Sequence, residues 1–134
     1  MKILMDTHIL LWAVSGDGRL PAKAAELINA EENDLYYSLV SLWETELKHV
    51  LHPDLLPVGA RELAGFCRES GFIEIPLREA QISELRGLHR QEGEPPHKDP
   101  FDRMLICQAE NEGLMLLTHN QLLAGYHEPC VLTV

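Results

Sequence analysis

The sequence has little positive charge. Its 134 residues include 21 Asp and Glu against 11 Lys and Arg, which gives a formal net charge of −10. Nucleic-acid-binding domains are usually basic, so the overall charge argues against a nucleic-acid partner. The apolar fraction of 46% and charged fraction of 24% are ordinary for globular proteins and exclude disorder as the dominant state.

Long apolar runs and paired cysteines are also missing. No run reaches the roughly 18 residues of a membrane span, and the apolar stretch after Lys2 is too short for a secretory signal peptide. Cys67, Cys107 and Cys130 form no Cys-x-x-Cys pair, which argues against a zinc site or a disulfide framework. We therefore expect a cytoplasmic protein without a membrane partner.

The sequence lacks the common cofactor and nucleophile motifs as well. It contains no Gly-x-Gly-x-x-Gly, no Walker loop and no Gly-x-Ser-x-Gly, and its histidines form no His-Glu-x-x-His pair. It also has no internal repeat and no low-complexity linker. One domain over residues 1–134 is the expectation for this length.

Short apolar runs alternate with segments of helical periodicity. Strands are predicted over residues 3–5, 35–38, 72–75 and 114–117, with a fifth candidate over 131–134. Helices are predicted over 7–14, 21–33, 41–52, 59–70, 78–90 and 99–113, the fifth with Ile82, Leu85 and Leu88 on one face. Strands separated by such helices pair in parallel through right-handed crossovers, which predicts a three-layer α/β domain.

Four carboxylates are expected where ligands bind in such folds, beyond the carboxyl ends of the strands. They end the first strand, follow the second strand or begin the helix over 99–113: Asp6, Glu44, Asp99 and Asp102. Each also has a purely structural interpretation. Asp6 and Asp99 are suited to be helix N-caps, and Ser41 with Glu44 has the spacing of a capping box.

The set of acids is more informative than any member. Two carboxylates about 4 Å apart repel by roughly 4 kcal/mol at an effective dielectric constant near 20. A cluster of three must therefore take up a proton or bind a hard cation. Oxygen ligands favour Mg²⁺ or Mn²⁺ over zinc. A cation held in this way suits phosphodiester or phosphoryl chemistry.

Further polar residues are expected at the same edge. Thr118 and Asn120 follow the fourth strand and either hold a ligand or form a turn and N-cap. Lys48 lies one helical turn after Glu44 and either forms a modest surface pair or contacts phosphate.

Three stretches resemble PIN domains, and more narrowly VapC-type toxins of type II toxin–antitoxin pairs. They are residues 5–12 (MDTHILLW), 40–44 (VSLWE) with Lys48, and 97–109 (HKDPFDRMLICQA), and the similarity continues through 117–120 (LTHN). The resemblance implies a Rossmann-like α/β/α fold with a central parallel sheet. It further implies an often homodimeric, Mg²⁺- or Mn²⁺-dependent ribonuclease that a cognate antitoxin inhibits.

The resemblance also implies roles for individual residues. Asp6, Glu44 and Asp102 match the metal-holding acids, and Asp99 matches an additional catalytic acid. Substrate or water positioning falls to a second set: Thr7, Thr118, Asn120, Lys48 and Arg103. The resemblance implies a fourth acid at the position where this chain has Asn120. This difference favours a one-metal site, a second ion that arrives with the RNA phosphate, or a catalytically weak PIN-fold binding module.

Two alternatives come from other classes. A phosphoacceptor signalling domain shares the size, fold class and Mg²⁺ pocket, but it needs an acceptor acid after the third strand, where this chain has Pro76. A metal-free binding module would use the acids only as helix caps. Because a local patch of metal with Lys48, Lys98 and Arg103 would meet RNA, the net charge of −10 does not exclude an RNA substrate.

Overall fold

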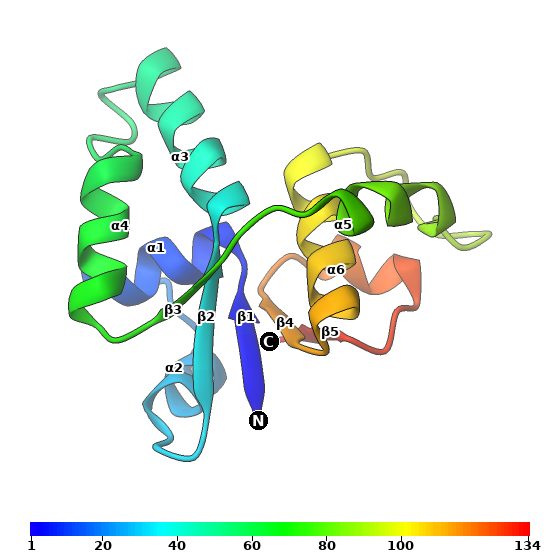
Figure 1. Cartoon of the computed structure of the whole chain (residues 1–134), viewed down its shortest axis with the longest axis horizontal. Coiled ribbons are helices and arrows are strands. Elements are labelled where there is room, and N and C mark those ends of the chain that lie inside the picture. The colour runs from blue at the N-terminus through cyan, green and yellow to red at the C-terminus, as the bar shows by residue number, and fades with distance from the viewer.

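The computed structural model describes all 134 residues and contains one parallel sheet with helices on both faces (Figure 1). The strand order is β3-β2-β1-β4-β5, and every neighbouring pair is parallel. The strands are β1 (Lys2–Met5), β2 (Asp34–Ser38), β3 (Ile73–Ile75), β4 (Met115–Thr118) and β5 (Val131–Thr133). The predicted three-layer α/β fold is confirmed.

Six α-helices and two 3₁₀ helices connect the strands. The α-helices are α1 (Thr7–Ser15), α2 (Ala22–Asn29), α3 (Leu39–Leu51), α4 (Ala60–Glu69), α5 (Glu79–Ser83) and α6 (Pro100–Glu112). The 3₁₀ helices are η1 (Glu84–Gly87) and η2 (Gln121–Tyr126). No helix has the length and apolar character needed to cross a bilayer.

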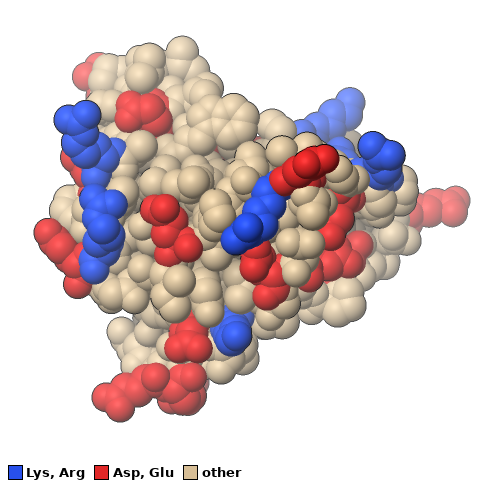
Figure 2. All heavy atoms as spheres, viewed as in Figure 1, with Lys and Arg blue, Asp and Glu red and all other residues tan.

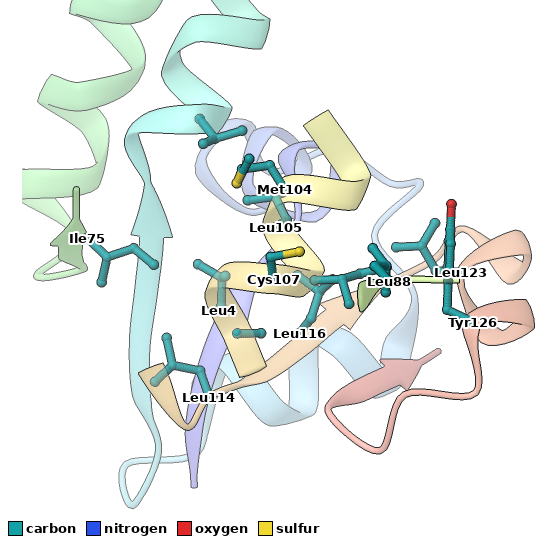
Figure 3. Close-up of a cluster of buried hydrophobic side chains, with 13 residues drawn as sticks. Leu4, Ile75, Leu88, Met104, Leu105, Cys107, Leu114, Leu116, Leu123 and Tyr126 are labelled. Atoms are coloured by element: carbon teal, nitrogen blue, oxygen red, sulfur yellow. The ribbon is translucent and has the colours of Figure 1, made fainter. Parts of the chain in front are cut away.

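Alternate residues of the central strands pack into two separate cores. Leu4 and Leu116 meet Leu105 of α6 on one face of the sheet (Figure 3). The neighbours of these two residues along β1 and β4 point to the opposite face of the sheet, where they form the second core with α1 and α4: Ile3, Met5 and Leu117. Burial on both faces explains why these strands read as continuous apolar runs.

The ends of α1 and α6 lie where the sequence predicts them. The Asp6 carboxylate accepts a hydrogen bond from Ile9 N at 2.8 Å and so caps α1. Asp99 caps α6, Pro100 is its first residue, and Gly113 ends it with a φ of +69°. That φ lies in the left-handed region, which glycine adopts without a Cβ clash.

The start of α3 differs from the prediction. The helix begins at Leu39, and its N-cap is Ser38, whose hydroxyl accepts a hydrogen bond from Val40 N at 3.0 Å. Because the chain turns into the helix directly after β2, Ser41 lies inside the first turn, where its hydroxyl accepts a hydrogen bond from Thr7. Ser41 and Glu44 therefore form no capping box, and this structural interpretation of Glu44 is wrong.

The single helix predicted over 78–90 is also wrong. The segment forms α5, which ends at Ser83, and then η1. Ile82 is 47% exposed, whereas Gln81 is fully buried and donates hydrogen bonds to Glu112 and Asn111 of α6. Leu85 and Leu88 of the predicted apolar face do pack against the core, whereas Gln81 is buried in place of Ile82. Similarly, Pro21 precedes α2 instead of beginning it, and α2 ends at Asn29 rather than near Asn33.

The buried position of Leu105 predicts a large effect on stability. Leu105→Ala is expected to lower the free energy of unfolding by about 2–5 kcal/mol, because it leaves a cavity between the sheet and α6. Leu55→Ala is the matched control, since Leu55 is 82% exposed. Urea denaturation measures both values, and equal losses would contradict the assignment of the core.

Candidate active site

The sheet reverses its order between β1 and β4. β2 and β3 lie on one side of β1, whereas β4 and β5 lie on the other. In open α/β sheets, ligands bind beyond the carboxyl ends of the strands at such a reversal. Asp6 follows β1 here, and Thr118 ends β4 and donates a hydrogen bond to Asp6 Oδ2 at 2.5 Å. The first predicted site residue thus lies at the expected ligand position.

Glu44 and Asp102 come from two helices that pack against each other. In Figure 1, α3 continues from the upper end of β2, and α6 lies beside it. Trp43 of α3 meets Phe101 of α6 edge to face, with ring centroids 5.0 Å apart. Ser38, the cap of α3, donates to the Gln108 side chain at 2.5 Å. These contacts fix the helix that carries Glu44 against the helix that carries Asp102.

The four predicted acids act on one another electrostatically. Asp6 and Glu44 are only 3% and 2% exposed. Burial raises the pKa of Asp6, although hydrogen bonds from Thr118 and from Ile9 N oppose the shift. Burial and then the neighbouring charge of Asp99 raise the pKa of Asp102 to about 6, and the charges of Glu44 and Asp6 add to this effect.

Most of these acids use one carboxylate oxygen for a protein contact and leave the other free. Glu44 Oε2 lies 2.7 Å from Lys48 Nζ, whereas its buried Oε1 has no hydrogen-bond partner. Asp99 accepts both of its backbone hydrogen bonds on Oδ1. Asp102 makes its contacts, with His97 and Asn120, through Oδ2. One oxygen on each of these three side chains is therefore available to a ligand.

This donor set fits a hard divalent cation. A buried oxygen without a partner, such as Glu44 Oε1, loses its hydration on folding, and a cation would compensate for that loss. Carboxylate oxygens are the ligands that Mg²⁺ and Mn²⁺ prefer. No three Asp, Glu, His or Cys side chains already stand at the spacing of a metal shell.

The residues predicted to position substrate or water have different contacts. Thr7 is buried and donates to Ser41 Oγ at 3.0 Å, which ties α1 to α3. Asn120 caps η2 and also places its Nδ2 at 3.4 Å from Asp102 Oδ2. Lys48 pairs with the buried Glu44 and is not merely part of a surface pair.

Arg103 is the residue of that set that the structure does not bring to the acids. Its Nη2 donates to the backbone carbonyl of Leu88 at 3.2 Å. Position 103 lies about 100° around α6 from Asp102, which turns the two side chains in different directions. The guanidinium thus contacts the segment after η1 and forms no hydrogen bond or ion pair with the four acids.

Sequence reasoning missed the polar contacts that support the acids. His97 lies in the loop before α6, where its Nε2 is 3.1 Å from Asp102 Oδ2 and makes no recorded contact with Asp99. Ser38 and Gln108 are 70 residues apart in the chain, so no local pattern could reveal their contact. The closeness of His97 to the DPFD stretch was the one available signal.

Comparisons with known proteins agree with this fold. The family model of the PIN domain matches residues 3–126. No curated protein matches. Among solved structures, VapBC2 from Rickettsia felis bound to a promoter DNA fragment aligns with a TM-score of 0.67 at 17% identity, over 100% of this chain and 98% of that one.

Two other solved structures also match. A toxin–antitoxin complex from Klebsiella pneumoniae aligns with a TM-score of 0.64 at 23% identity, over 98% of this chain and 96% of that one. FitAcB from Neisseria gonorrhoeae aligns with a TM-score of 0.52 at 19% identity, over 92% and 89% of the two chains. At such identities the similarity shows a shared fold.

The strand order argues against the phosphoacceptor alternative. Flavodoxin-like signalling domains have the order 2-1-3-4-5, which places the third strand beside the first. Here β1 is flanked by β2 and β4, and β3 is an edge strand. An acid after β3 would therefore lie away from Asp6.

Without metal, the raised pKa of Asp102 predicts lower stability at neutral pH. Folding raises this pKa from 3.8 to about 6, so the folded state binds more protons than the unfolded state between these values. The contribution of Asp102 to the free energy of unfolding thus falls as the pH rises through this window, by on the order of 2–3 kcal/mol.

Urea denaturation in EDTA, at about pH 4.5 and about pH 7, checks this. Asp102→Asn is expected to be more stable than the wild type at the higher pH and to differ less at the lower one. Asp54→Asn, at an exposed acid, is the control. A difference between wild type and Asp102→Asn that is independent of pH would contradict the prediction.

Proposed function

The chain belongs to the PIN domain family, and on this premise we propose that it is a divalent-metal-dependent ribonuclease toxin of the VapC type. The observation that carries the proposal is the buried, unpartnered Glu44 Oε1, together with the neighbouring acids whose charges raise the pKa of Asp102. The solved structures that resemble the chain include toxin–antitoxin complexes, which supports the toxin assignment. Cytoplasmic RNA is the proposed substrate.

The proposed reaction is hydrolysis of an RNA phosphodiester. A water oxygen bonds to phosphorus and the P–O3′ bond breaks, which leaves a 5′-phosphate and a 3′-hydroxyl. Mg²⁺ or Mn²⁺, when bound, offsets the charge on the phosphate and makes water a better nucleophile. Asp6, Glu44 and Asp102 would hold this cation.

Neighbouring groups of the chain orient the acids for that task. The hydroxyl of Thr118 and the amide of Ile9 hold the two oxygens of Asp6. Lys48, whose side chain is 45% exposed, keeps a positive charge beside Glu44 and within reach of solvent. We propose that Lys48 meets a phosphate of the substrate. Asn120 contacts Asp102 at the position where the family resemblance implies a fourth acid.

The surface charge makes the cation important for RNA binding. Figure 2 shows acidic side chains spread over the viewed face, with Lys and Arg in separate small groups rather than a continuous basic stripe. With a net charge of −10, long-range attraction of RNA is not available. RNA affinity is therefore expected to be weak and to depend on metal.

We also propose a cognate antitoxin as a protein partner. A cavity of about 690 Å³ lies between α1, α4 and the loop after α3, with mostly apolar walls and Lys48 at its edge. Leu11, Trp12 and Phe66 are among its lining residues. An apolar antitoxin segment would cover this cavity, and a basic residue near it would reach the acids beside Lys48.

A homodimer is the remaining part of the proposal. One face of α3 carries large apolar side chains that are each more than a third exposed: Trp43, Leu47, Val50 and Leu51. Val50 and Leu51 are 69% and 65% exposed. Contiguous exposed apolar patches of this kind often mark sites of protein–protein interaction.

Val50→Asp is expected to convert the dimer to a monomer, because it places a charge in the centre of that face. Light scattering after size-exclusion chromatography measures the molar mass. Ile82→Asp is the matched control, since Ile82 is 47% exposed on α5 and should leave the dimer intact. A monomeric wild type, or a Val50→Asp dimer, would contradict this interface.

Metal-dependent RNA cleavage is the direct test of the function. Purified protein is incubated with tRNA and mRNA fragments in Mg²⁺, Mn²⁺ or EDTA, and cleavage is expected only with metal. Asp6→Asn and Asp102→Asn should each lower kcat/KM by at least about 100-fold, because each removes a charge that holds the cation. Asp54→Asn should not. Cleavage in EDTA, or by Asp6→Asn at the wild-type rate, would reject the proposal.

A further inference from the structure

We propose that His97 and Tyr126 act as a positioning pair that holds the Asp102 carboxylate in the orientation needed to bind the cation. The proposal rests on the proposed function, because it concerns the same site. His97 is then neither a metal ligand nor a reacting group. It acts through Asp102, which is less deeply buried than Asp6 and Glu44.

The geometry places His97 between Asp102 and Tyr126. The His97 side chain is 5% exposed and lies in the loop before α6. Its Nε2 is 3.1 Å from Asp102 Oδ2, and its Nδ1 is 2.7 Å from Tyr126 Oη. The His97 and Tyr126 rings also meet edge to face, with centroids 5.5 Å apart. Both nitrogens of a nearly inaccessible imidazole are thus engaged by protein groups.

The number of available protons determines which nitrogen of His97 donates a hydrogen bond and which accepts one. Tyr126 Oη lies 2.7 Å from His97 Nδ1 and 3.2 Å from the His97 carbonyl oxygen, and it carries only one proton. A carboxylate oxygen only accepts, so the contact with Asp102 requires the proton of a neutral ring on Nε2, and Nδ1 then accepts from the Tyr126 hydroxyl. Nε2 then carries the ring proton and donates it to Asp102 Oδ2. If Nε2 carried no proton, it and the ionised Asp102 Oδ2 would be two hydrogen-bond acceptors 3.1 Å apart.

The loop that carries His97 is itself fastened to η2. Arg90 donates from Nε to the Pro95 carbonyl at 2.7 Å and from Nη1 to the Leu122 carbonyl at 2.6 Å. Its guanidinium lies over the Tyr126 ring, 4.7 Å from the centroid. Gly125 makes room for it, because a Cβ there would stand 2.5 Å from Arg90 Cζ. The position of His97 is therefore held by several independent contacts.

The consequence for Asp102 is a fixed choice of oxygen. His97 and the more distant Asn120 both contact Oδ2, so Oδ1 is left without a protein partner. Donors that hold the second oxygen of a metal-binding carboxylate restrict its rotation and so reduce the entropy lost on binding. Loss of such a supporting partner costs 10- to 100-fold in metal affinity or activity in metalloproteins generally.

The simplest competing explanation is that His97 only packs the loop. The chain contains a matched control for that possibility. His127 makes a similar contact, with its Nε2 3.0 Å from Glu94 Oε1, but its side chain is 57% exposed and has no recorded contact with the four acids. Changes at His127 should therefore report the loss of a histidine–carboxylate pair without an effect on metal binding.

The first experiment needs neither metal nor activity. Long-range ¹H–¹⁵N NMR of the histidine rings in the metal-free protein identifies which nitrogen of His97 carries a proton. A proton on Nε2 is expected, and Tyr126→Phe is expected to weaken this preference. A ring with a bare Nε2 would overturn the proposal.

The second experiment measures Mn²⁺ affinity by calorimetry. His97→Leu is expected to weaken binding by about 10- to 100-fold. His97→Gln, which retains a side-chain N–H, should recover most of that loss, and His127→Leu should match the wild type. Tyr126→Phe keeps the shape of a side chain that is 2% exposed and should give an intermediate value, which retains a test if His97→Leu does not fold.

The outcomes distinguish a failure of the positioning role of His97 from a failure of the proposed metal-dependent function. If the wild type binds Mn²⁺ and folded His97→Leu binds it equally well, the positioning role is wrong while the proposed function stands. If His97→Gln is as weak as His97→Leu, the donated hydrogen bond is not the cause and the proposal also fails. A wild type that binds no Mn²⁺ rejects the proposed function and with it this inference.

Discussion

The burial of carboxylates at the reversal of the sheet is the constraint on which the rest of the structure depends. Asp6 is 3% exposed between two central strands, where a charged group is costly unless it is well hydrogen-bonded. Its two oxygens accept from Ile9 N and from Thr118, so β4 must end beside β1. Glu44 is compensated only on one oxygen, by Lys48. Because Glu44 Oε1 is buried without a partner, the carboxylate is suited to bind a cation.

A chain of buried polar groups sets the distance between the two helices that supply the other acids. Ser38 caps α3 and donates to Gln108, which in turn donates to Gln81 and to the Pro76 carbonyl. Apolar contacts are non-directional and would tolerate sliding of α3 along α6. Hydrogen bonds with fixed geometry do not, so the positions of Glu44 and Asp102 follow from this network.

Helix capping and ligand binding are compatible roles in this site. From the sequence, Asp99 was better explained by a cap than by a functional role, and the structure shows it capping α6 through Oδ1 alone. Its second oxygen stays free. Asp6 likewise caps α1 through one oxygen. A carboxylate has about four acceptor positions, so a cap uses only part of its capacity. Evidence for a cap is therefore no evidence against a ligand.

The sequence by itself determined the succession of strands and helices along the chain, the parallel sheet and the position of Asp6 at the carboxyl end of β1. These follow from apolar periodicity, from short-range signals such as Asp99-Pro100 and Gly113, and from the handedness of crossovers, all of which are local or general. Only the tertiary structure decided the start of α3, the burial of Gln81 in place of Ile82, the direction of Arg103 and the contact of His97 with Asp102. Each of these depends on hydrogen bonds between segments distant in the chain or on the direction of a single side chain, and neither leaves a periodic pattern in the sequence.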